Sequence, residues 1–254
     1  SFAKVSEDMH TGVVVEVNAE TDFVAKNAKF QAYVDQVCDQ ALTTSATDID
    51  AFLAEKWNLD ETRTVADQLS EEITIIGENM HIRRFHKLVE NEGLVSAYIH
   101  AGGRIGVILQ VKSDVVNDAV AEMAKNIAMQ IAALNPKYTT RAEVDQEYLA
   151  HETAILTEAA KNEKPNAPEK VLNGMVQGRL NKELKEICLV DQTYVRAEDG
   201  KQTVQQYVDS VAKAQGAKIS LVTFVRYETG EGLEKKSEDF AAEVAAQQAA
   251  AKKN

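Results

Sequence analysis

The sequence is poor in several features that mark particular classes of protein. Among its 254 residues are only 2 cysteines, Cys38 and Cys188, with no C-x-x-C pair. It therefore contains neither a disulfide framework nor a cysteine-rich zinc site. Because isolated cysteines in such a chain behave as small apolar side chains, we expect two buried free thiols.

Positive charge and long apolar runs are also scarce. The chain has 28 Lys and Arg against 40 Asp and Glu, a formal net charge of -12. A phosphate backbone needs a basic surface, so we expect no direct nucleic-acid partner. No run approaches the roughly 18 consecutive apolar residues of a membrane span, and residues 1–20 lack the basic-then-apolar order of a signal peptide. These absences predict a cytoplasmic protein with no membrane partner.

Catalytic and cofactor motifs are missing as well. The patterns G-x-x-x-x-G-K, G-x-G-x-x-G, H-E-x-x-H and G-x-S-x-G do not occur, and the 5 histidines are dispersed. Nucleotide hydrolysis, dinucleotide redox chemistry, zincin and hydrolase functions therefore have no anchor. We expect no enzyme activity, no cofactor and no metal. Gly102-Gly103-Arg104 has two interpretations, a hairpin turn or a phosphate cradle.

Apolar periodicity predicts an α+β fold with two similar halves, each an antiparallel sheet with packed helices. Alternating apolar residues predict a strand over 12–17, and steps of three and four predict a helix over 27–42. The same order recurs in 106–111 and the helical stretch that follows, which indicates an internal duplication. Further strands are expected where β-branched residues gather, at 82–89, 94–100, 105–111 and 219–227. We interpret the first three of these as an antiparallel meander.

Shorter helices complete this part of the prediction. One spans 65–76 and stops before Gly77, and another begins at a capping box of Thr203 and Gln206. A short helix is expected to contain Phe52 and Trp57.

The strand signal vanishes between 144 and 188, where helical spacing on both sides of 163–168 predicts a hairpin of two helices. Asn166 and Glu169 resemble a capping box for the second helix, and Val144 and Ile155 are expected on the packed side of the first. A narrow apolar stripe and many charges predict that this hairpin projects from the core, and we hypothesise that it pairs with a second copy as a homodimer, in a bundle or coiled coil.

The predicted units follow from these patterns. They are an N-terminal core unit at 1–92, a C-terminal core unit made of 93–143 and 189–230, the hairpin at 144–188, and a C-terminal helical module at 231–254.

The most informative segment joins the first strand to the first helix and consists of Thr21, Asp22, Phe23 and Val24, which we call the wedge. An aromatic ring beside a carboxylate on such a connection can insert apolar area into a partner and present charge there. The alternative is that Asp22 caps a helix and Phe23 packs into the core. Alanine at both positions would abolish the effect on the partner and leave the melting temperature nearly unchanged in the first case, and would cause a large loss of stability in the second.

Several segments resemble the elongation factor Ts family, the nucleotide exchange factors of the translational GTPase elongation factor Tu. The matching segments follow the family's order and cover most of the chain: 21–26, 77–84, 100–106, 127–133, 173–179, 224–232 and 239–244. The resemblance implies a bacterial cytoplasmic protein whose partner is elongation factor Tu, in its GDP-bound and nucleotide-free forms.

The family resemblance assigns roles to particular residues. Asp22 and Phe23 would enter the partner's GTP-binding domain, spread two helices and disturb the magnesium and phosphate site. Ile105 and Gly106 match a second contact surface, although a buried strand with a close backbone approach explains them equally well.

Other positions complete the implied contacts. Gln130 stands where some members carry histidine, so a role there would use hydrogen bonding. The C-terminal module would contribute Asp239, Phe240 and Val244.

The sequence leaves two other functions to consider, a binding-only adaptor and an enzyme. The family usually begins with a helical module of about fifty residues that grips the partner, and this chain begins after it. A binding-only adaptor core, whose exchange activity needs that module, is therefore the main alternative. An enzyme acting on a small acid or sugar would require a cluster of His, Asp or Glu that the sequence does not show.

Overall fold

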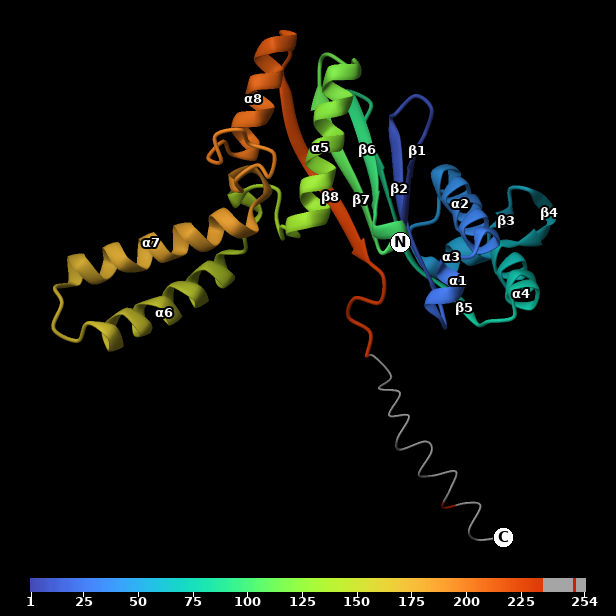
Figure 1. Cartoon of the computed structure of the whole chain (residues 1–254), viewed down its shortest axis with the longest axis horizontal. Helices are drawn as coiled ribbons and strands as arrows, with labels where there is room; N and C mark the ends of the chain where they lie inside the picture. The colour runs from blue at the N-terminus through green and yellow to red at the C-terminus, as the bar shows by residue number, and fades with distance from the viewer. Residues whose placement is uncertain (235–248, 250–254) are drawn as a thin grey trace.

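The computed structural model describes residues 1–234 and 249 and has the predicted α+β fold (Figure 1). Two three-stranded antiparallel sheets lie back to back, with helices on the outer flank of each. The expected C-terminal helix, with Asp239, Phe240 and Val244, lies outside the described residues.

The first sheet has the order β1-β2-β5, and its central strand β2 is flanked by two antiparallel neighbours. Its strands are β1 (Phe2–Val5), β2 (Thr11–Ala19) and β5 (Met80–Val89). The helices on its flank are α2 (Ala28–Thr43), α3 (Ile49–Ala54) and α4 (Val65–Ile76), and a small hairpin of β3 (Lys56–Trp57) and β4 (Asp60–Thr64) lies among them. Valines of β2 pack there against the apolar face of α2.

The second sheet repeats this plan with the order β6-β7-β8. Its strands are β6 (Gly93–His100), β7 (Ile105–Ser113) and β8 (Ile219–Glu228), and its helices are α5 (Asp118–Leu134) and α8 (Val204–Gln215). In both halves the second strand leads into a helix and the last strand returns to pair with that second strand. The expected similarity of the two halves is thereby confirmed.

The two sheets meet through a thin apolar layer, and this arrangement corrects the predicted meander. Five buried side chains form the layer: Ala3, Val14, Leu88, Val95 and Ile108. Of the three strands of the predicted meander, only β6 and β7 pair with each other, in a hairpin closed by the short 3₁₀ turn η1 (Ala101–Gly103); β5 pairs with β2 instead. The reason is that β5 and β6 belong to different sheets, a long-range choice that strand propensity does not encode.

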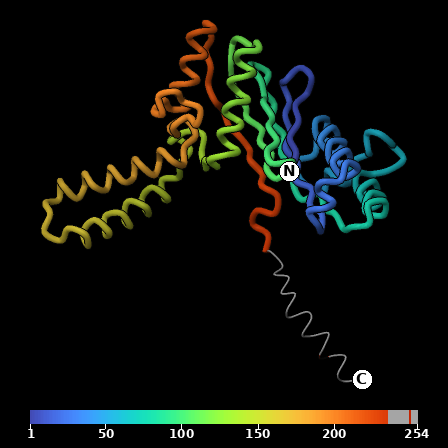
Figure 2. Tube along the Cα trace, viewed as in Figure 1, coloured from blue at the N-terminus to red at the C-terminus, as the bar shows by residue number. Residues whose placement is uncertain are grey.

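The chain between α5 and α8 forms the helical hairpin, which projects away from the sheets (Figure 2). Its helices are α6 (Gln146–Glu163) and α7 (Glu169–Ile187), preceded by the 3₁₀ turn η2 (Arg141–Glu143) and followed by η3 (Leu189–Asp191). One small cluster holds the base (Val144, Leu184 and Cys188) and another holds the tip (Ala160, Leu172 and Val176).

The structure confirms two predicted helix ends and the predicted state of both cysteines, and corrects a third cap. The helix caps at Gly77, with φ of 83°, and at Thr203 with Gln206 are confirmed, and both cysteines are buried free thiols. The cap at Asn166 is wrong, because the residue before α7 is Pro168, which forms no side-chain cap.

Two apolar positions were also misplaced. Trp57 lies on β3 rather than in a helix, where its ring packs near that of Tyr33. Ile155 lies on the outer side of α6, with 47% of its surface exposed. When the apolar stripe of a helix is narrow, the sequence does not determine which face of the helix packs inward.

Candidate functional site

The wedge forms a single helical turn, α1 (Asp22–Ala25), at the end of β2 where the chain turns towards α2 (Figure 1). Thr21 caps this turn, because its side chain accepts a hydrogen bond from the Val24 N–H. Val24 is buried, whereas Phe23 is 88% exposed, more than any other large apolar side chain that the structure describes. The alternative in which Asp22 caps the helix and Phe23 enters the core is therefore wrong.

Backbone and side-chain hydrogen bonds surround this turn. The Asn27 N–H donates to the Val24 carbonyl at 2.8 Å, and the Asn27 side chain in turn caps α2. On the other side, Thr21 donates its N–H and its hydroxyl to the carboxylate of Glu78. The exposed ring of Phe23 is thus carried by a turn that is attached to the fold at both ends.

The predicted second surface lies in the interior of this structure. Ile105 is 8% exposed at the start of β7, and a Cβ on Gly106 would lie 3.0 Å from Cγ2 of Val14. This is the close backbone approach of the alternative interpretation.

Gln130 is fully buried in α5, and its hydrogen-bond partners lie in the segment after the hairpin. Its amide donates to Gln192 Oε1 and to the Thr193 carbonyl, and its carbonyl accepts the Val195 N–H at 2.8 Å. A hydrogen-bonding role is present, but it joins α5 to the segment after the hairpin and does not reach solvent. Contact of Gln130 with a partner is therefore not supported by this structure.

A buried carboxylate, Glu16, links the two halves near the wedge and was missed at the level of sequence. It is fully buried on β2 and accepts hydrogen bonds from Arg83 (3.1 Å), from Arg84 and from the Gly230 N–H (2.8 Å). Burial alone raises its pKa, but the Gly230 and arginine contacts outweigh that effect and hold the pKa below its usual value.

The arginines place this cluster between the halves, because Arg84 also stacks on the ring of Tyr227 on β8, 4.0 Å from its centroid. The sequence carried only a weak signal for this cluster, namely a charged residue, Glu16, among the valines of a predicted strand. Its partners come from two of the family-like segments, 77–84 and 224–232.

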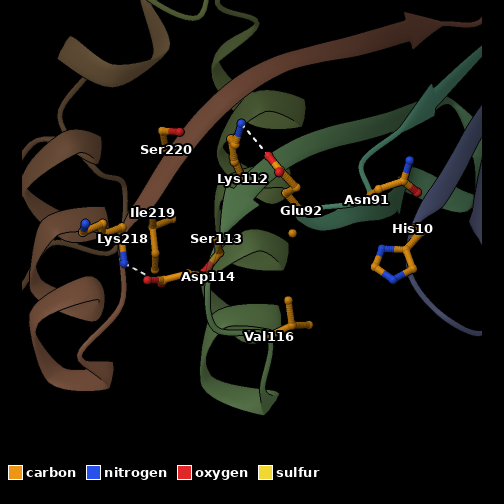
Figure 3. Close-up of a pocket in the computed structure, with 11 residues that line it drawn as sticks. His10, Asn91, Glu92, Lys112, Ser113, Asp114, Val116, Lys218, Ile219 and Ser220 are labelled. Carbon is orange, nitrogen blue, oxygen red and sulfur yellow. Dashed lines mark hydrogen bonds and ion pairs between the residues drawn. The ribbon is translucent and has the colours of Figure 1, made fainter.

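A groove of about 690 Å³, whose lining residues are drawn in Figure 3, includes His10 at the end of β2 opposite the wedge. Two of its carboxylates have partners, since Glu92 pairs with Lys112 at 2.7 Å and Asp114 accepts the backbone N–H of Lys218 at 2.7 Å. Among residues 1–234 there is no group of three side chains suited to a metal ion. Nor does that part of the chain contain a helix long and apolar enough to cross a membrane.

Comparison with known proteins shows the family to which the chain belongs. A family model described as "Elongation factor TS" matches residues 20–231. The chain belongs to the elongation factor Ts family. The match includes the wedge, Ile105, Gly106 and Gln130, and ends before Asp239.

Named relatives agree with this assignment. Elongation factor Ts of Clostridioides difficile (strain 630) is 46% identical over 244 residues, covering 96% of this chain and 78% of that protein. Elongation factor Ts of Clostridium botulinum (strain Eklund 17B / Type B) is 45% identical over 243 residues, with the same coverage of 96% and 78%. Membership in this elongation factor Ts family supports a role in translation elongation as a nucleotide exchange factor, rather than as a catalyst of a chemical reaction.

Proposed function

We propose that this elongation factor Ts chain binds elongation factor Tu and accelerates GDP release by inserting Asp22 and Phe23 into the partner's GTP-binding domain. The inserted ring would disturb the magnesium and phosphate site there. The observation that supports the proposal best is the 88% exposure of Phe23 beside a buried Val24. An apolar ring held away from its own core is available to a partner.

The energetics of the wedge agree with such a role. Burying a Phe side chain contributes roughly 1.5–3 kcal/mol, and a hydrogen bond to a charged group such as Asp22 adds about 1.5–3 kcal/mol. Exchange requires that this energy be gained only in the partner state that holds GDP weakly, because a ligand shifts an equilibrium through its differential affinity. Since each 1.4 kcal/mol is about a factor of ten, the pair is large enough to change GDP release by orders of magnitude.

The test is stopped-flow release of a fluorescent GDP analogue from elongation factor Tu, with the parent chain and with Asp22→Ala/Phe23→Ala. We expect the acceleration to be lost in the variant while the melting temperature stays unchanged, because Phe23 is exposed. Leu59→Ala is the matched control, since Leu59 is also exposed (68%) but lies between β3 and β4. Acceleration retained by the double variant would contradict the proposal.

The same assay separates exchange from the adaptor alternative. Binding of elongation factor Tu without faster GDP release by the parent chain would make this chain a binding-only core. In the wedge hypothesis binding and acceleration weaken together in the double variant.

The homodimer remains a second proposal, supported by two exposed apolar side chains on the hairpin, Ile155 (47%) and Val171 (44%). Pairing of 144–188 with a second copy would bury them. Light scattering at micromolar concentration tests this, and a monomeric mass would contradict it.

A further inference from the structure

We propose that Glu78 is a positioning residue of the wedge, holding Thr21 and, through Thr21, the helical turn that presents Phe23. Thr21 donates its backbone N–H to Oε2 of Glu78 at 3.1 Å and its hydroxyl to Oε1 at 2.6 Å. One residue thus engages both carboxylate oxygens. We call the paired contact between Glu78 and Thr21 the brace. Its consequence for exchange rests on the proposed function, whereas the brace itself rests on geometry alone.

Strand register places the two residues opposite each other. The last pair between β2 and β5 is Ala19 with Met80, and antiparallel pairing runs one residue forward as the other runs one back. Continuing that register brings Thr21 to Glu78. The chain reaches Glu78 through the left-handed Gly77 that ends α4, so the carboxylate is located by a strand pair and by a helix end.

The hydroxyl of Thr21 connects the Glu78 carboxylate to the backbone of the wedge. It donates to Glu78 and accepts the Val24 N–H at 3.4 Å, and a hydroxyl can serve both bonds. Donation to Glu78 leaves its lone pairs free to face the turn. The carboxylate therefore orients the N-cap of α1.

A turn of this length needs such support. Helix formation has a costly first turn, and α1 (Asp22–Ala25) is only 4 residues long. The exposed Phe23 contributes little burial of its own, so the turn is attached to the fold by the buried Val24, by the N-cap Thr21 and by the Asn27 N–H. Loss of the brace should leave the body intact and let the turn open.

The first experiment measures opening in the chain alone, as the rate of chymotrypsin cleavage after Phe23 under native conditions, with fragments identified by mass. We expect Glu78→Ala and Thr21→Val each to raise the rate about tenfold, the size of effect of one or two such hydrogen bonds. Thr21→Ser keeps both donors and should behave as the parent. Because the two residues act as one unit, the double variant should open no more than the more open single variant.

A matched control excludes simple loss of an acidic charge. Glu61→Ala removes an exposed carboxylate of β4, for which no side-chain hydrogen bond is found among the described residues, and it should leave cleavage unchanged. Melting temperatures of all variants show whether opening is local or global. Parent-like cleavage in Glu78→Ala, or additive effects in the double variant, would overturn the proposal.

The second experiment carries the brace into GDP exchange. A wedge that is oriented for only part of the time binds more weakly by that fraction, so the concentration of Glu78→Ala giving half-maximal acceleration should rise by the factor by which the oriented fraction falls, while the maximal rate is retained. A lower maximal rate with unchanged cleavage would mean that Glu78 touches the partner directly, and would overturn the brace. If the parent chain fails to accelerate GDP release, the proposed function fails while the cleavage experiment still decides the role of Glu78.

Discussion

Replacing Glu16 by glutamine tests whether the buried carboxylate joins the two halves of the molecule. The substitution keeps the shape of the side chain and removes its charge. Arg83, Arg84 and the Gly230 N–H would then face a neutral amide. The Glu16 side chain has no exposed surface, whereas the arginines keep 25% and 29% of theirs.

These exposures set the magnitude. Removing one partner of a fully buried ion pair costs about 3–5 kcal/mol, because the other charge is left without compensation. Water reaches both arginines and recovers part of that loss, so we expect Glu16→Gln to lower the free energy of unfolding by about 2–3 kcal/mol. For a chain of this size the melting temperature should fall by roughly 4–12 °C.

Chemical denaturation and calorimetry measure this loss directly. Glu92→Gln is the control, because Glu92 pairs with Lys112 on the surface, where both side chains are more than half exposed, and it should leave the melting temperature unchanged. A Glu16→Gln chain as stable as the parent would refute the argument that this carboxylate holds the halves together.

The pH dependence provides a second check on the same residue. The pKa of Glu16 is lowered in the folded chain from an ordinary value of 4.5, so its contribution is fully present above that value. It is lost as the pH falls through the lower folded pKa. The stability difference between the parent and Glu16→Gln should therefore be constant near neutral pH and shrink in acid. A difference that grows in acid would contradict the assigned sign.

Four further substitutions follow from local geometry. Tyr33→Phe should be neutral or raise stability by up to about 1 kcal/mol, because its hydroxyl is buried without a partner among the described residues; denaturant titration measures this. Gly174→Ala should stabilise α7 by about 0.5–1 kcal/mol, since a Cβ there meets open space, whereas Gly93→Ala should cost about 3 kcal/mol or more, since its Cβ would lie 2.0 Å from a backbone oxygen; melting temperatures that move together would refute this contrast. Gln130→Met should cost about 2–3 kcal/mol by leaving the Val195 N–H unpaired, and a smaller loss in calorimetry would show that water replaces the amide.

Local sequence patterns predicted much of the fold, because they report nearby causes. The alternation over 12–17 and the stripe over 27–42 became β2 and α2, and Thr203 with Gln206 caps α8 as expected. Such features depend on residues within one or two turns of each other.

What the sequence failed to predict depends on distant partners. The pairing of β5 with β2, the burial of Gln130 and the cluster around Glu16 each join segments far apart in the chain. The wedge was located by its residue types, but the choice between a core ring and an exposed ring was decided by the packing of Val24 beneath the turn. A segment of four residues is too short for hydrophobic periodicity to show which of its side chains are buried.

The two small clusters of the hairpin have a consequence for how the molecule loses its structure. Neither the base (Val144, Leu184 and Cys188) nor the tip (Ala160, Leu172 and Val176) shares side chains with the cores beneath the sheets. Segments with few buried contacts open at a lower free energy than the body to which they are attached. Amide hydrogens of α6 and α7 should therefore exchange with deuterium well before those of β2 and β7. On warming, we expect the helical hairpin to unfold first, while the wedge and both sheets remain folded.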